Sequence, residues 1–223
     1  MKVLSSLAIK GVYLELVPQF EKARGYKIET HWVGMADIRK RMLGGEAADL
    51  IIASATLIDE LVQAGKLARG SRVDLVRSGV AVAVKKGARK PDISSAAALT
   101  RALRGAKSIA YSSGPSGIYL AGLFERLGIA AELKDRMTQT PPGVLVAELV
   151  ARGEKEIGFQ QLPELRQVEG IDIVGPLPDE IQTVTVFAGG IPTSARDADG
   201  ARALIEFLTS PAAAALARSK GFL

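Results

Sequence analysis

The stretch YSSGPSGIYL, residues 111–120, places three serines and two glycines between an apolar segment and a helical pattern. Three roles fit such a turn: an anion seat, a serine nucleophile on a tight turn, or a cap for the following helix. A serine nucleophile needs a base, and the only histidine, His31, falls within an early strand pattern. The turn also lacks the G-x-S-x-G spacing of a nucleophile elbow and the G-K-[ST] of a phosphate-binding loop.

Small and hydroxyl-bearing residues recur where predicted strands give way to helices. In α/β sheets, ligands gather outside the carboxyl ends of strands, where helices begin and unpaired N–H groups point outward. A serine at one such end is most often only a helix cap, so the repetition carries the prediction of an anion seat. Several helix N-termini, each with about half a positive charge, could together hold a dianion without a metal. The residues are Ser5, Ser6, Gly34, Met35, Ser54, Ser112, Ser113, Ser116 and Gly143.

The composition excludes several other kinds of site. With no cysteine, the chain forms no disulfide, thiolate nucleophile or cysteine metal site. Asp49, Asp59 and Glu60 are too dispersed to indicate a carboxylate metal site, so we expect no metal and no cofactor. The net charge of +5 is modest, and the basic runs at 39–42 and 85–90 contain no aromatic side chains, so we expect no nucleic-acid partner. No apolar run reaches the roughly 20 residues that span a bilayer, so we expect no membrane span.

Strand and helix patterns alternate with almost no long loops, which predicts an α/β fold with largely parallel sheets. Apolar runs predict strands in KVLSS, KIETHW, ADLIIAS, GVAVAVK, KSIAYSS, EIGFQQ, IDIVGPL and QTVTVFAGGI. Periodic patterns predict helices over residues 9–24, 36–43, 57–64, 96–104, 118–127, 144–151 and 198–208, with a final helix from Pro211 that Gly221 closes.

Two of these strands, at residues 79–84 and 183–188, differ from the others. They are long and β-branched and precede turns that contain glycine or proline, as expected of strands that run between two lobes. If both cross over, residues 1–79 and 183–223 form one lobe and residues 80–182 form the other. A single sheet with two ordinary central strands fits the periodicity equally well.

Nearly the whole chain resembles one family. The segments that carry the resemblance are KVLSS, ADLIIAS, SIAYSSGPSGIYLAGLFERLGI, GVLVAELVARGEKEIGFQQLPEL, VGPLPDEIQTVTVFAGGI and ALIEFLTSPAAAALARSKGF. That family is the periplasmic molybdate-binding protein family, type 2 extracellular solute-binding proteins of ABC transporters. The resemblance implies a two-lobed periplasmic-binding-protein fold of type 2, with a mixed, mostly parallel sheet in each lobe and two crossover strands as a hinge. It also implies an oxyanion held between the lobes by neutral serine hydroxyls and backbone N–H groups.

The resemblance places ligand contacts at Ser5 or Ser6, near Gly34 and Met35, at Pro115 to Gly117 with Ser116 foremost, and near Gly143 and Val144. Two segments depart from molybdate binders. Where those proteins have a serine-rich turn, this chain has VGMAD, and where they have a tyrosine after a strand, this chain has IGFQQ. Phe159 cannot donate a hydroxyl, whereas Gln160 or Gln161 could donate an amide N–H to a carboxylate. Arg77, at the edge of a predicted crossover strand, could contact a carboxylate through two N–H groups or form a surface ion pair.

Two functions follow as alternatives. The first is a solute-binding protein that captures a small anion, an oxyanion or an organic carboxylate, for ABC-type uptake, with the membrane subunits of the transporter as partners. The second follows from a relative of the family that acts as an aconitate isomerase, an enzyme that shifts a double bond of a tricarboxylic acid and needs a base such as Tyr111, Tyr119 or a carboxylate. A cytoplasmic anion sensor is a third role for the same fold. For the first two roles we expect a monomer in the periplasm, exported by a signal peptide outside this sequence.

Overall fold

The chain forms two compact units in the computed structural model, which describes residues 1–223. Unit 1 comprises Met1–Ser78 and Thr185–Leu223, and unit 2 comprises Gly79–Val184. The chain passes from unit 1 to unit 2 within strand β4 (Val73–Lys85) and returns at the start of strand β9 (Val184–Gly190). No helix is both long enough and apolar enough to cross a membrane.

The sheet of unit 1 has the strand order β2-β1-β3-β9. Strand β1 pairs in parallel with β2 and with β3, whereas β9 runs antiparallel to β3. The first three strands are β1 (Lys2–Ser5), β2 (Glu29–Trp32) and β3 (Leu50–Ser54). The helices are η1 (Leu7–Ile9), α1 (Lys10–Arg24), α2 (Met35–Leu43), α3 (Ala55–Gln63), α9 (Ala198–Leu208) and α10 (Pro211–Ser219).

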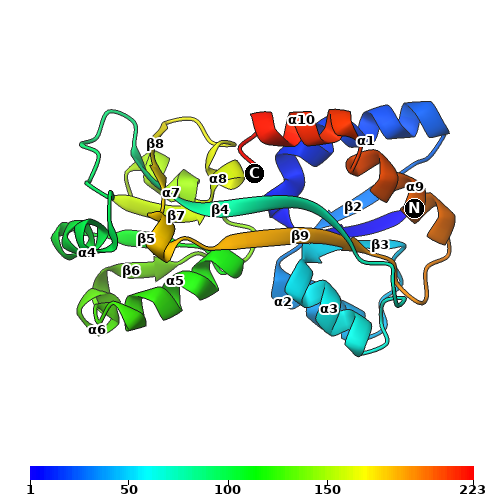
Figure 1. The fold of residues 1–223 in the computed structure, drawn as a ribbon, viewed down its shortest axis with the longest axis horizontal. Coiled ribbons are helices and arrows are strands. Elements are labelled where there is room, and N and C mark those ends of the chain that lie inside the picture. The colour runs from blue at the N-terminus through cyan, green and yellow to red at the C-terminus, as the bar shows by residue number, and fades with distance from the viewer. The chain divides into compact units, whose positions relative to one another are not determined.

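Helices cover both faces of this sheet, as Figure 1 shows for α1, α9 and α10 on one side and α2 and α3 on the other. The alternation of side chains along a strand explains the two layers. Val3 of β1 packs among residues of α1, α9 and α10, whereas its neighbour Leu4 packs among residues of α2 and α3. All five residues of β3 are buried, as expected of a strand covered on both faces.

The sheet of unit 2 has the order β6-β5-β7-β4-β8. Strand β5 pairs in parallel with β6 and β7, and β4 runs antiparallel to β7 and β8. The strands are β5 (Ile109–Tyr111), β6 (Met137–Gln139), β7 (Ile157–Gln161) and β8 (Ile171–Pro176). The helices are α4 (Ala96–Gly105), α5 (Pro115–Arg126), α6 (Ala130–Leu133), η2 (Lys134–Arg136), α7 (Val146–Arg152), α8 (Leu162–Leu165) and η3 (Asp179–Ile181).

The two faces of this second sheet also bury different side chains. Phe159 of β7 packs with α4, α5 and α6 in the larger core cluster. Its neighbour Gly158 faces α7, where an added Cβ would lie 2.6 Å from Val150. Helix α7 therefore lies close against β5 and β7, and the N–H of its first residue, Val146, donates to the Gln160 side chain of β7.

Among the predicted boundaries that were wrong, three have consequences for a candidate site residue. Helix α5 begins at Pro115 rather than at residue 118, because proline fits the first helical position, so Ser116 lies inside the first turn. Strand β4 begins at Val73 rather than at residue 79, so Arg77 lies within the strand and not at its edge. Helix α7 begins at Val146 rather than at residue 144, so Gly143 and Val144 belong to the preceding turn. The short strand β6 was not predicted at all, because three residues are too few to show a period.

Candidate functional site

Buried polar side chains of unit 1 gather at the carboxyl ends of its parallel strands. Ser5 ends β1, Ser6 follows it, and Ser54 ends the neighbouring β3. The Ser6 hydroxyl accepts a bond from the Ala8 N–H at 3.2 Å, and the Ser54 hydroxyl accepts one from the Leu57 N–H at 3.4 Å. Both serines are thus helix caps, as the commoner interpretation predicts, yet accepting a bond leaves each hydroxyl hydrogen available to a ligand.

Gly34 and Met35 lie where β2 leads into α2. Gly34 is the N-cap of this helix, and no side chain caps it. The first N–H groups of α2 are therefore left without a partner from a cap, which is the state that an anion seat requires. The Met35 side chain is half-buried and packs against both core clusters of unit 1, so its contribution to a ligand is through its backbone.

In unit 2, the strand register brings three polar residues into one row. Tyr111 of β5 pairs with Gln139 of β6 and with Phe159 of β7. One residue further along each strand stand Ser112, Thr140 and Gln160. All three are buried. Together with Ser116, Gln161 and Glu164 they are the buried polar side chains of unit 2, and we call this set the unit 2 edge.

Ser112 and Ser116 form a hydroxyl pair at the unit 2 edge. Their Oγ atoms lie 2.9 Å apart, and Ser112 Oγ also accepts a bond from the Gly114 N–H at 3.3 Å. Gly117 permits this close turn, because a Cβ there would lie 1.5 Å from the Ser112 carbonyl oxygen. The predicted seat is therefore a compact turn in which two hydroxyls and the first turn of α5 face the same strand end. Ser113 is half-buried beside them.

Thr140 was not predicted from the sequence. Its backbone N–H donates to the Tyr111 carbonyl at 2.9 Å, but its buried Oγ1 has no hydrogen-bond partner. A buried hydroxyl without a partner is uncommon and costs free energy. No local pattern could have pointed to Thr140, because its strand is too short to recognise and only the pairing of β6 with β5 brings it beside Ser112.

Glu164 is the second residue that sequence patterns missed. It lies on the single turn of α8, directly after β7, and its side chain is buried. Burial raises the pKa of Glu164 to about 7, and hydrogen bonding from the Gln160 side chain and the Gln161 backbone lowers it only in part. The Gln160 Oε1 in turn accepts a bond from the Val146 N–H at 2.9 Å. One amide side chain thus connects the carboxyl group to the start of α7.

The remaining predicted residues have less support from the geometry. Gly143 adopts a left-handed φ of 88° in the turn before α7, and Val144 beside it is exposed. Arg77 is exposed on β4 within unit 1. The Tyr119 hydroxyl donates a hydrogen bond to the Ile181 carbonyl at 2.8 Å, so its proton is already used in a bond within unit 2. Tyr111 is half-buried, with its ring edge-on to Phe124.

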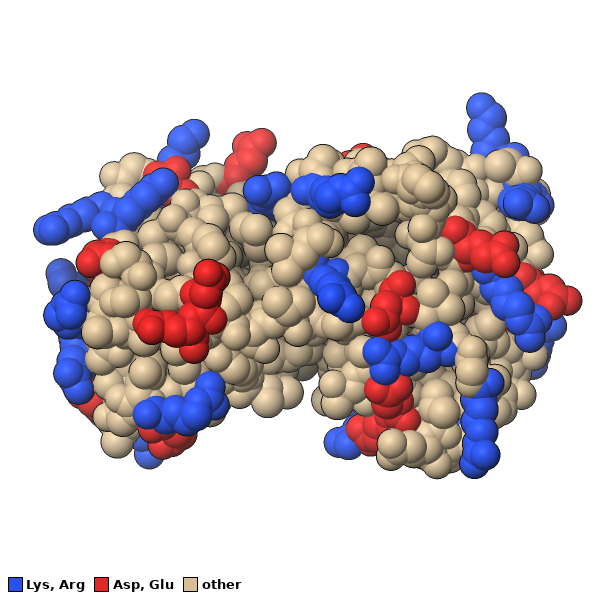
Figure 2. All heavy atoms as spheres, in the orientation of Figure 1, with Lys and Arg blue, Asp and Glu red and all other residues tan.

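Charged side chains of both signs are interspersed over the visible face of the molecule (Figure 2). Several of them form surface ion pairs, such as Arg39 with Glu60 and Arg72 with both Asp59 and Asp74. Pairs of this kind contribute little to stability. The polar side chains at the strand ends differ from these surface groups, because they are buried and largely uncharged. For this reason we take the strand ends as the candidate sites.

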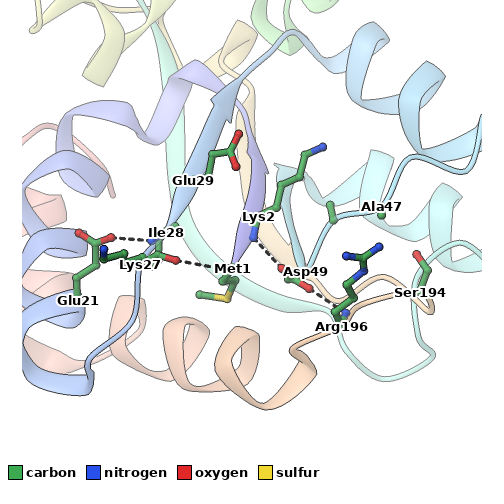
Figure 3. Close-up of a pocket in the computed structure, with 11 residues that line it drawn as sticks. Met1, Lys2, Glu21, Lys27, Ile28, Glu29, Ala47, Asp49, Ser194 and Arg196 are labelled. Atoms are coloured by element: carbon green, nitrogen blue, oxygen red, sulfur yellow. Dashed lines mark hydrogen bonds between the residues drawn. The ribbon is translucent and has the colours of Figure 1, made fainter.

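A hollow of 730 Å³ in unit 1 is lined by none of the predicted site residues. Figure 3 shows the residues that line it. Its lining includes Lys2 and Glu29, which begin β1 and β2, and Asp49, which precedes β3. The hollow is therefore at the amino ends of these strands, whereas Ser5 and Ser54 are at their carboxyl ends. The Asp49 carboxylate is bound by the N–H groups of Lys2, Arg196 and Asp197, at 2.7 to 3.1 Å. These bonds tie the strand to the loop before α9, which is a structural role.

The chain has the mixed α/β fold of periplasmic binding proteins, with small and hydroxyl-bearing residues at the ends of its parallel strands. Solved structures confirm this fold. The periplasmic molybdate-binding protein of Azotobacter vinelandii superposes with a TM-score of 0.82 and 19% identity over 100% of this chain and 98% of that one. The sulfate-binding protein SubI of Mycobacterium tuberculosis gives 0.80 and 19% over 100% and 85%.

The sequence comparison defines the family. Residues 1–223 match the bacterial extracellular solute-binding proteins, and the chain belongs to this family. An aconitate isomerase of Pseudomonas sp is 41% identical over 229 residues, which cover 99% of this chain and 86% of that protein. The structural likenesses, at 19% identity, establish the fold, whereas the isomerase is similar in sequence along the whole chain.

Proposed function

We propose that the protein binds a small polycarboxylate anion and shifts its double bond, the activity for which the Pseudomonas relative is named. The observation that carries this proposal is the buried Glu164 carboxyl, which follows the end of β7 and is hydrogen-bonded by the Gln160 side chain and the Gln161 backbone. An enzyme that moves a proton between two carbon atoms needs such a group.

The chemistry of the strand ends supports an anionic ligand. Hydroxyl and backbone N–H donors bind ionised oxygens with bonds roughly twice as strong as those between neutral groups. A tricarboxylate presents six oxygens and so needs many donors at separate points. Hydroxyl groups of this kind stand at strand ends within each unit: Ser6 and Ser54 in unit 1, and Ser112 with Ser116 in unit 2.

A second function is the capture of a small oxyanion or carboxylate for ABC-type uptake. The family itself favours it, as do the molybdate- and sulfate-binding proteins of the same fold. In this case the membrane subunits of a transporter would be the partners. Either function agrees with a periplasmic monomer and with residues 80–182 acting as a separate lobe.

The two functions are separated by two measurements on the same preparation. A thermal-shift series uses molybdate, tungstate, sulfate, phosphate, citrate and cis- and trans-aconitate, because a ligand at 100 times its dissociation constant adds about 2.7 kcal/mol of stability. Proton NMR then follows trans-aconitate incubated with the protein. Binding of the aconitates with conversion supports the isomerase. A shift confined to molybdate or tungstate, without conversion, supports uptake and contradicts the isomerase.

Variants connect the result to the site. Ser116→Ala removes one hydroxyl of the buried pair and is expected to weaken binding of the identified ligand about tenfold. Ser94→Ala, at an exposed serine of unit 2, is the matched control and leaves binding unchanged. Unchanged affinity in Ser116→Ala, with an intact fold, would remove this hydroxyl from the site.

A further inference from the structure

Glu164 is placed at the end of a strand where ligands gather in this class of fold. Strand β7 ends at Gln161, and α8 carries Glu164 three residues later. In the register of the sheet, β7 lies next to β5, whose own end carries Ser112. Glu164 is 9% exposed as a residue, and its carboxyl is bound by the Gln160 side chain and the Gln161 backbone. Because β5 and β7 run in parallel, Ser112 and Glu164 both follow strand ends at the same edge of the sheet.

Part of the placement of Glu164 is explained by ordinary helix capping. Gln161 is the N-cap of α8 and Glu164 is its third helical residue, the position from which a carboxylate reaches back to the N-cap N–H. Capping carboxylates are normally solvated. Here the Gln160 side chain provides a second hydrogen bond, and the bond from the Val146 N–H fixes the orientation of that amide.

The burial of Glu164 is not compensated by any cation. Helix α8 packs against β7 and α7, and its Leu165 also packs against β4 and β8. The pKa of Glu164 is governed by burial and by the two hydrogen bonds, with no contribution from a charged neighbour. The charged groups on these elements and beside α8 are Asp74, Arg77, Lys85, Glu148, Arg152, Arg166 and Asp172. Buried carboxyl groups that serve only the fold are usually paired with a cation.

From this arrangement we propose that Glu164 is the acid–base residue of the site, the group that takes and returns the proton of a bound unsaturated tricarboxylate. This inference rests on the proposed isomerase function. The Glu164 carboxylate removes a proton from the methylene carbon of trans-aconitate, and the electrons of that C–H bond form a new double bond to the central carbon. The electrons of the old double bond take a proton from the Glu164 carboxylic acid at the opposite carbon. The substrate and product have the same atoms, and neither an oxidant nor a reductant is needed.

The pKa of Glu164 suits both proton transfers, the removal of the proton and its return. A group with a pKa of about 7 is present in both protonation states near neutral pH, so it is a sufficient base in the first half and a sufficient acid in the second. The Gln160 amide keeps the carboxyl oriented through both halves, because it is itself held by Val146. The Ser112 and Ser116 hydroxyls lie 2.9 Å apart after the end of the neighbouring β5, and in this proposal they bind a substrate carboxylate.

The test is the conversion of trans-aconitate by Glu164→Gln, followed by proton NMR, with binding measured separately by thermal shift. Glutamine keeps the shape of the protonated acid and can still accept the bond from the Gln161 N–H, so the fold is expected to persist. We expect conversion to fall about 100-fold or more, while the thermal shift by trans-aconitate remains. Glu169→Gln, which removes an exposed carboxylate after α8, is the control and retains full activity and the wild-type pH profile.

A second variant guards against a change in folding. Glu164→Asp keeps the carboxyl group but withdraws it by one methylene, and we expect partial activity with a displaced pH profile. In the wild type, activity falls as the pH decreases through about 7, because the carboxylate form starts the reaction. Wild-type rates in Glu164→Gln would overturn the assignment while leaving the isomerase function in place. Absence of conversion by the wild type would overturn both.

Discussion

The Ser112 carbonyl oxygen occupies the space in which a side chain on Gly117 would begin, 1.5 Å from the position of its Cβ. The backbone turn after β5 therefore closes directly onto the first turn of α5. This contact fixes the relative position of Ser112 and Ser116, whose hydroxyls lie 2.9 Å apart. A glycine at 117 is thus a requirement of the seat, and not only a residue that gives a ligand access to the backbone.

Gly117→Ala is expected to lower the free energy of unfolding by at least about 3 kcal/mol, because no rotamer can remove a methyl group from a backbone oxygen. Urea unfolding followed by circular dichroism measures this loss. Gly122→Ala on the same helix is the control. Its Cβ would meet only the flexible end of Arg126, at 3.4 Å, so alanine is expected to raise stability by up to about 1 kcal/mol. Equal effects of the two substitutions would contradict the packing argument.

Thr140→Val is expected to stabilise the ligand-free protein by about 1 kcal/mol. Valine has the shape of threonine, and the exchange removes a buried hydroxyl that has no partner. Thr138→Val, two residues earlier, is the matched control, because the Thr138 hydroxyl accepts a bond from the Lys155 ammonium group at 2.7 Å and its loss should not stabilise. The difference in urea midpoints gives the result, and a destabilised Thr140→Val would show that this hydroxyl has a partner in solution.

The pKa of Glu164 predicts how stability changes with pH. In the unfolded chain a glutamate loses its proton near pH 4.3, whereas the folded protein keeps it up to about pH 7. Between these values the folded state binds more protons, so stability falls as the pH rises, by up to about 1.4 kcal/mol per pH unit. Urea unfolding of wild type and Glu164→Gln at pH 5, 6, 7 and 8 measures this slope. The variant should lose the contribution of Glu164 to this slope, and it should be more stable than the wild type at pH 8.

The fold was predictable from the sequence because its signals are local and repeated. Every strand pattern that was named overlaps a strand of the structure, and the family resemblance agrees with the fold of the solved relatives. The serine caps at Ser6 and Ser54 were also readable, since the cap and the helix adjoin in sequence. Thr140 and Glu164 were not readable, because Thr140 depends on the pairing of a three-residue strand and Glu164 on the packing of α8 against β7 and α7. Burial of a charged residue is decided by tertiary packing, which no spacing encodes.

Asp49 connects the start of β1 to the loop that leads into α9, and its removal should destabilise unit 1. Burial by itself raises the pKa of Asp49, but backbone bonds from Lys2, Arg196 and Asp197 outweigh it, so the pKa is lowered. The bonds to the carboxylate therefore stabilise the fold above the unfolded pKa near 3.9, and this contribution is lost as the pH falls below it.

Asp49→Ala is expected to lower the free energy of unfolding by about 2 kcal/mol at pH 7, since bonds to a charged group contribute about 1.5 to 3 kcal/mol and three backbone donors lose their acceptor. Asp199→Ala is the control within the same region, because that side chain is 95% exposed and pairs only with Arg202; it should change stability by no more than about 0.5 kcal/mol. The measurement is urea unfolding at pH 7 and pH 3. If the gap between the two variants did not narrow at pH 3, the carboxylate would not be the source of the stabilisation.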